Sequence, residues 1–132
     1  MDAYFERRAR EIFSSIRYAT IATSNSQGEP WNTPVSAVHD RDGNIYWISD
    51  RRNQHSRNIR QNPNVFIVFY DSTVPPGKGE GVFLAAQAVE LSDIDEIQQA
   101  RQIIGEADAP GSEPFAGYSI LRLYQAVPPT PG

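Results

Sequence analysis

The chain has 132 residues and a mass of 14.8 kDa, and its content of 39% hydrophobic and 21% charged residues is typical of one globular domain. It contains no cysteine, which excludes disulfides, thiolate metal sites and a cysteine nucleophile, and its two histidines are too few for a multi-histidine metal site. The net charge of −4 argues against a general nucleic-acid-binding protein.

The chain also lacks the features of a membrane or exported protein. Its longest strongly apolar stretch, residues 65–70, is far shorter than the roughly 20 residues that span a bilayer. Its first residues lack the basic and apolar pattern of a signal peptide. We therefore expect a soluble, cytoplasmic protein with a single domain over residues 1–132, whose partners include neither membrane nor nucleic acid.

The sequence predicts short strands separated by turns, with helices between some of them. The predicted strands cover residues 18–24, 31–39, 45–49, 65–70, 81–91 and 118–126. The predicted helices cover residues 2–17, with Asp2 as the cap, 53–62 and 92–104, and residues 127–132 form a Pro-rich tail.

Three local patterns refine this assignment. Pro34 places its strand at an edge of the sheet, or at a point where a ladder hydrogen bond is absent. Residues 65–70 are apolar on both faces, which predicts a central strand. Ser92 and Asp95 resemble a capping box at the start of the last helix.

The order of these elements predicts a mainly β (α+β) fold. The first three strands follow one another without crossover helices, which disfavours a parallel sheet. Six antiparallel strands with late helices instead favour a small barrel with helices packed outside it.

The basic residues are concentrated in one segment. Four arginines lie within residues 51–60, and no acidic residue occurs between Asp50 and Asp71. A concentrated positive segment in a mildly acidic protein suits a small anionic ligand better than a long polyanion. The alternative is a solvated helix face, and charge alone does not decide between the two.

This segment runs from the end of a strand into the start of a helix, where free N–H groups and the helix dipole favour anions. Arginine also suits phosphate, because its guanidinium forms forked hydrogen bonds. The segment therefore predicts a phosphate site. Its neutral donors are Ser49, Gln54 and Ser56, and its charged groups are Arg51, Arg52, His55 and Arg57.

From about residue 18 to residue 126 the chain resembles the pyridoxamine 5′-phosphate oxidase-like, FMN-binding split β-barrel family. The order and spacing of several short stretches carry the resemblance, although no single stretch is specific. They are ATIAT (19–23), GEP (28–30), TPV (33–35), IYWIS (45–49), HSRNI (55–59) and NPNV (62–65).

The resemblance implies a six-stranded antiparallel split β-barrel that forms a homodimer with flavin at the subunit interface. It implies that the end of the third strand and the start of the next helix hold the flavin phosphate, and that the second strand passes beside the ring. The start of the partner's fifth strand, residues 80–82, would approach the ring edge. The cofactor-binding residues that we predict are Asn32, Thr33, Pro34, Val35, Ser36, Ile48, Ser49, Arg51, Gln54, His55 and Ser56.

Departures from the family pattern limit the expected activity. Ala37 stands where the family has a substrate-binding lysine, and His55 stands where the family more often has lysine at the phosphate. We therefore expect an FMN-dependent oxidoreductase that does not oxidise vitamin B6, with an unknown small-molecule substrate and no assigned catalytic residue. The alternatives are a deazaflavin coenzyme in place of FMN, or a non-catalytic dimeric carrier or sensor of flavin, deazaflavin or heme.

Overall fold

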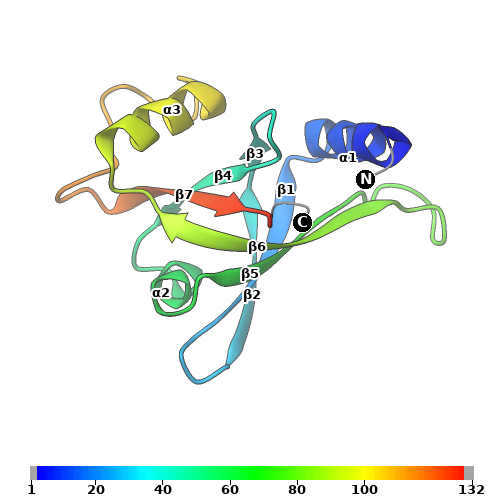
Figure 1. Ribbon diagram of the computed structural model, residues 1–132, viewed down its shortest axis with the longest axis horizontal. Coiled ribbons are helices and arrows are strands. Elements are labelled where there is room, and N and C mark those ends of the chain that lie inside the picture. The colour runs from blue at the N-terminus through cyan, green and yellow to red at the C-terminus, as the bar shows by residue number, and fades with distance from the viewer. Residues whose placement is uncertain (1–2, 130–132) are drawn as a thin grey trace.

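The computed structural model describes residues 3–129 and consists of one curled sheet with three helices around it (Figure 1). The predicted Asp2 cap and residues 130–132 of the predicted tail lie outside the described residues. The elements in chain order are α1 (Ala3–Ser15), β1 (Tyr18–Ser24), β2 (Pro30–Ser36), β3 (Val38–His39), β4 (Ile45–Asp50), α2 (Gln54–Gln61), β5 (Asn64–Tyr70), β6 (Gly81–Glu90), α3 (Ile94–Ile104) and β7 (Leu121–Val127).

The sheet has the strand order β2-β1-β5-β6-β7-β4-β3, and its pairs are antiparallel. The predicted mainly β, split-barrel fold class is therefore confirmed, but the count of six strands is wrong. The predicted strand over residues 31–39 is two strands, because the chain leaves β2 at Ser36 and enters β3 at Val38. β2 and β3 are opposite edges of the sheet, so this single connection curls the sheet back on itself.

Ala37, the residue between these two edges, is buried, and its N–H donates to the Arg17 carbonyl at 2.9 Å. Pro34 lies in β2, and the prediction of an edge strand is confirmed. An edge position explains why a residue without an N–H donor is tolerated there.

Two apolar cores lie on opposite sides of the curled sheet. The inner core contains Ile21 and Ile67, and the Trp47 ring stacks on Tyr124 with centroids 5.6 Å apart. The second core lies under α3, where Ile97 packs with Leu123 of β7. Helix α3 thus covers the outer side of the sheet near β3, β4 and β7.

β5 is central in the sheet, as predicted, but its burial on both faces is wrong for this chain. Val65, Ile67 and Phe69 point into the core, whereas Phe66 and Tyr70 are nearly half exposed on the outer side. We use "open face" for the outer side of β2, β1, β5 and β6, defined by Thr20, Ala22, Pro30, Trp31, Asn32, Phe66, Val68, Tyr70 and Phe83.

The last predicted strand begins later than expected, since residues 118–120 form a loop before Leu121. The Arg122 side chain explains this difference, because it donates hydrogen bonds to the Gly117 and Ser119 carbonyls. Val127, assigned to the tail by sequence, is the last residue of β7.

The cap of α3 also differs from the prediction. Asp93, not Ser92, is the N-cap, and its Oδ2 accepts a hydrogen bond from the Glu96 N–H at 3.1 Å. We expect Asp93→Ala to lower the free energy of unfolding by about 1 kcal/mol, because the first turn loses its acceptor. Ser92→Ala is the matched control and should change it by less than about 0.5 kcal/mol. Urea unfolding measures both, and equal losses would contradict this cap.

Candidate functional site

The turn between β4 and α2 is fixed by the carbonyl of Asp50. This oxygen accepts the Ser56 hydroxyl at 2.9 Å and the Asn53 N–H at 3.1 Å. Ser56 is fully buried beneath the turn. Its hydroxyl therefore positions the start of α2, and a predicted phosphate contact would have to use its N–H group.

His55 contributes a neutral group. Its ring is buried, and its Nε2 lies 3.0 Å from the Ser49 hydroxyl. Burial lowers the pKa of His55 below 6.5, so the ring is uncharged at neutral pH. The sequence analysis includes His55 among the positive charges at the phosphate. The buried, neutral ring does not support that assignment.

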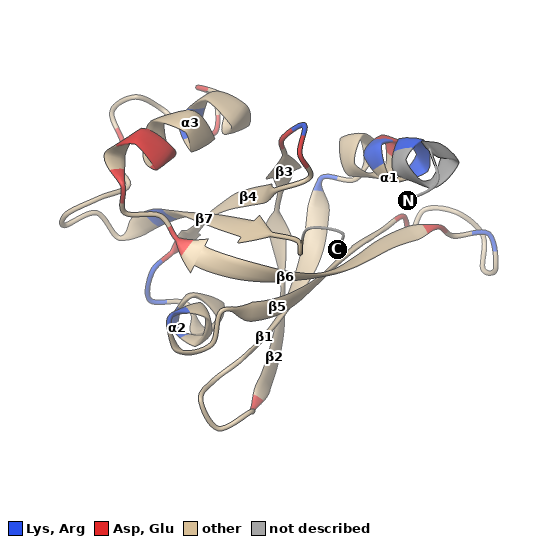
Figure 2. Cartoon of the chain, in the orientation of Figure 1, with Lys and Arg blue, Asp and Glu red and all other residues tan. Residues whose placement is uncertain are grey.

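Figure 2 shows basic residues on the turn after β4 and on α2. Two of the four arginines in this segment have an acidic partner and two do not. Arg52 forms an ion pair with Asp50 at 2.7 Å, and its hydrogen bonds lower the pKa of that carboxyl to about 2. Arg60 forms an ion pair with Glu90 at 2.9 Å. Arg51 and Arg57 have no acidic partner among the side chains that the structure describes, residues 7–129. The uncompensated charge of the segment therefore lies on these two side chains.

The first turn of α2 is open to an anion. Asn53, its N-cap, makes no side-chain cap hydrogen bond, and the first turn contains no acidic residue. Gln54 accepts a hydrogen bond from Arg57 at 2.5 Å and donates one to Asn58 at 2.8 Å. The positive end of the helix dipole, the free first-turn N–H groups and Arg57 thus lie together.

The five predicted residues of β2 divide between the two faces of the sheet. Val35 is buried in the inner core, and Thr33 pairs with Ile21, which shares that core. Asn32, Pro34 and Ser36 are exposed on the outer side, where Asn32 borders a hollow of about 420 Å³ on the open face. A flat ligand on the open face could therefore touch the side chains of alternate β2 residues only.

A second, more enclosed hollow of about 160 Å³ lies at the other end of β2, beside Ser36 and Ile48. The Arg17 side chain lies at the rim of this hollow. Its Nε donates a hydrogen bond to the Ser36 hydroxyl at 3.1 Å, and its Nη2 lies 3.6 Å from the Asp108 carboxylate. Sequence reasoning missed Arg17 and Asp108, because nothing in the local sequence relates the start of β1 to the loop after α3.

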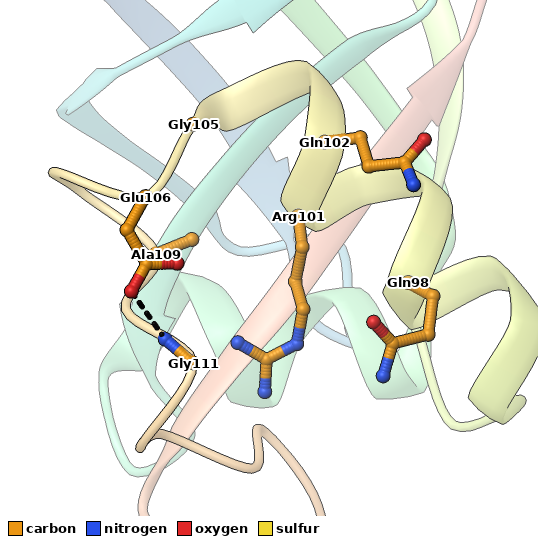
Figure 3. A pocket seen from close by; sticks show the side chains of 7 residues that line it. All are labelled: Gln98, Arg101, Gln102, Gly105, Glu106, Ala109 and Gly111. Atoms are coloured by element: carbon orange, nitrogen blue, oxygen red, sulfur yellow. Dashed lines mark hydrogen bonds between the residues drawn. The ribbon is translucent and has the colours of Figure 1, made fainter.

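A further hollow is lined by residues of α3 and of the loop that follows it (Figure 3). Its volume is about 460 Å³, and Arg101 lies on its wall. The Arg101 guanidinium donates to the carbonyls of Pro110 and Glu113 and lies 4.8 Å from the Phe115 ring centre. Arg101 therefore serves to hold the loop that follows α3.

The two histidines, one buried and one partly buried, predict how stability changes with pH. Burial lowers the pKa of both His55 and His39 in the folded state below the ordinary value of 6.5. The unfolded chain then binds more protons, so the free energy of unfolding should fall as the pH decreases from 7 to 5, by at most about 1.4 kcal/mol per pH unit for one histidine. Urea unfolding measures this slope. The double variant His39→Gln/His55→Gln should have a smaller slope between pH 7 and 6, and an unchanged slope in that variant would refute the assignment.

Within the described part of the chain, no helix is long and apolar enough to cross a membrane. Among the side chains described for residues 7–129 there is also no group of three or more acidic or histidine residues arranged to hold a metal ion.

Residues 5–124 match the sequence family described as pyridoxamine 5′-phosphate oxidase, and the chain belongs to this family. A search of curated proteins finds none whose sequence matches.

Similar solved structures show the same fold at low sequence identity. The heme storage protein HutZ of Vibrio cholerae is 19% identical, with a TM-score of 0.74 over 96% of this chain and 91% of that one. An FAD-binding protein of Mesorhizobium loti is 16% identical, with a TM-score of 0.70 over 98% and 91%. ChuZ of Campylobacter jejuni is 18% identical, with a TM-score of 0.75 over 97% of this chain, which spans about half (54%) of ChuZ.

Proposed function

We propose that this protein is an FMN-binding oxidoreductase that holds the flavin phosphate at the start of α2. The observation that carries the proposal is the pair of uncompensated arginines, Arg51 and Arg57, beside an uncapped helix N-terminus. Family membership supports a flavin as the anionic ligand, and the FAD-binding relative supports it further. His55 and Ser49 would add neutral hydrogen bonds beneath the phosphate.

We also propose that the open face is the contact between two copies of the chain. Phe83 is 62% exposed, and Phe66 and Tyr70 lie on the same side of the sheet at nearly half exposure. A monomer rarely leaves so many large apolar side chains together in water. A second copy on this face would bury them and enclose a flavin lying along β2.

The bound flavin would supply hydride transfer at its N5 atom. The chain would hold the phosphate at α2 and the ring along β2, with Ser36 at the far end. The hollow beside Ser36 and Ile48 would then receive the small-molecule substrate, where Arg17 offers a hydrogen-bonding cation. No side chain needs to act as a nucleophile in this scheme.

A heme carrier is the second candidate, because HutZ is named as a heme storage protein. Histidine is a common axial ligand of heme iron, and this chain has two histidines. His55 is buried and hydrogen-bonded to Ser49, and His39 packs on the Phe13 ring at 5.1 Å. Neither histidine side chain is exposed, so a heme with a histidine axial ligand is disfavoured relative to flavin.

Absorption spectroscopy of the purified protein tests these alternatives. We expect FMN titration to give a bound-flavin spectrum that a nicotinamide nucleotide bleaches. Uptake of hemin or deazaflavin with no uptake of FMN would refute the proposal, and bound FMN that no donor reduces would favour a carrier.

A further inference from the structure

Hydrogen bonds within the loop that leads into β7 hold its conformation. The loop nevertheless exposes one aromatic ring to solvent. Arg122 donates from Nε to the Ser119 carbonyl at 3.1 Å and from Nη2 to the Gly117 carbonyl at 2.5 Å. The Ser119 hydroxyl donates to the Glu113 carboxylate, which also accepts a backbone N–H of the same loop. Tyr118 lies between these fixed residues, and its exposed fraction is 103%.

This loop also adjoins the candidate phosphate segment. The Arg51 N–H donates to the Ile120 carbonyl at 2.8 Å, which joins the loop to the turn between β4 and α2. Tyr118 is two residues from this contact, a separation of at most about 7 Å along the chain. Ile120 is itself nearly half exposed. An uncompensated cation, an exposed aromatic ring and an apolar side chain therefore border one edge of the phosphate segment.

We propose that Tyr118 stacks on the adenine ring of FAD, whose adenosine half would extend from the phosphate segment across this loop. The inference rests on the proposed function, because it requires the flavin phosphate to lie beside Arg51. Every base has a flat π-face that an aromatic side chain can cover. A ring on a fixed loop loses little conformational freedom when it binds. The Arg51 guanidinium would pair with the diphosphate that links the two halves.

A free nicotinamide dinucleotide fits this loop less well. Its nicotinamide must reach the flavin ring, which would lie along β2 toward Ser36 and away from α2. The platform at Tyr118 borders the phosphate end instead. The chemistry of the loop therefore favours an adenosine that is covalently joined to the flavin.

Fluorescence titration of the full chain with FAD and with FMN tests this inference. We expect FAD to bind about fivefold to a hundredfold more tightly than FMN, the range expected for one stacked base. Tyr118→Ala should reduce FAD affinity to that of FMN and leave FMN affinity unchanged. Tyr118→Phe is the matched control and should keep the preference for FAD, because it keeps the ring.

Equal affinities of the native chain for FAD and FMN would overturn this inference while leaving the proposed function intact. A preference for FAD that survives Tyr118→Ala would overturn it as well. A fall in particle mass by light scattering in Tyr118→Ala would instead assign the ring to a subunit contact. Failure to bind either flavin would overturn the proposed function itself, and this inference with it.

Discussion

Replacing Arg51 with glutamine is expected to weaken FMN binding about tenfold to a hundredfold and to leave riboflavin binding nearly unchanged. A hydrogen bond to a charged partner contributes on the order of 1.5–3 kcal/mol, and riboflavin lacks the phosphate that would form it. Arg51 has no acidic partner among the described side chains of residues 7–129, so its charge is available to a ligand. Parallel titrations with the two flavins measure the effect.

Arg52→Gln is the matched control for this prediction. Arg52 is the next residue and carries the same charge, but its guanidinium is bound to Asp50 at 2.7 Å. FMN affinity should therefore change less than about threefold, because most of its charge is already compensated. An Arg52 effect as large as the Arg51 effect would mean that only net charge matters, and the assigned geometry of the phosphate site would be wrong.

Introducing a charge on the open face is expected to separate the two copies of the proposed dimer. Phe83→Glu would place a carboxylate among Phe66, Val68 and Tyr70, where a second copy would bury it without a partner. The particle mass from light scattering should fall to 14.8 kDa at micromolar concentration. FMN affinity should fall more than about tenfold, because half of the enclosing surface is then lost.

Ile94→Glu controls for the effect of an added surface charge. Ile94 is 66% exposed, close to the value for Phe83, but it lies on α3 and away from the open face. This variant should keep both the dimer mass and the affinity for FMN. Dissociation of Ile94→Glu with retention of the dimer in Phe83→Glu would place the subunit contact on α3 instead.

Much of the fold could be predicted because local patterns and long-range packing agree. The apolar run of β5 and the helix predicted after β4 each carry a local signal that the structure confirms. The break at Ala37 carries no such signal. It arises because one buried residue joins the two edges of the curled sheet, a constraint that only the three-dimensional fold imposes.

The candidate site was less predictable from the sequence, because ion pairs between residues far apart in the chain decide which side-chain charges remain unpaired. The sequence places four arginines in the segment, but only the structure brings Glu90 of β6 to Arg60. The sequence also treats His55 as a charged group, whereas its burial against the end of β4 makes it neutral. Tyr118 was assigned to a strand, and only the hydrogen bonds of Arg122 show that it lies on a fixed loop.

Titration of the unmodified chain with FMN, with light scattering on the same samples, tests the central claim most directly. We predict saturation at one FMN per chain in a particle of twice 14.8 kDa. No flavin uptake, or saturable uptake by a particle of 14.8 kDa, would contradict a flavin site formed between two copies of this chain.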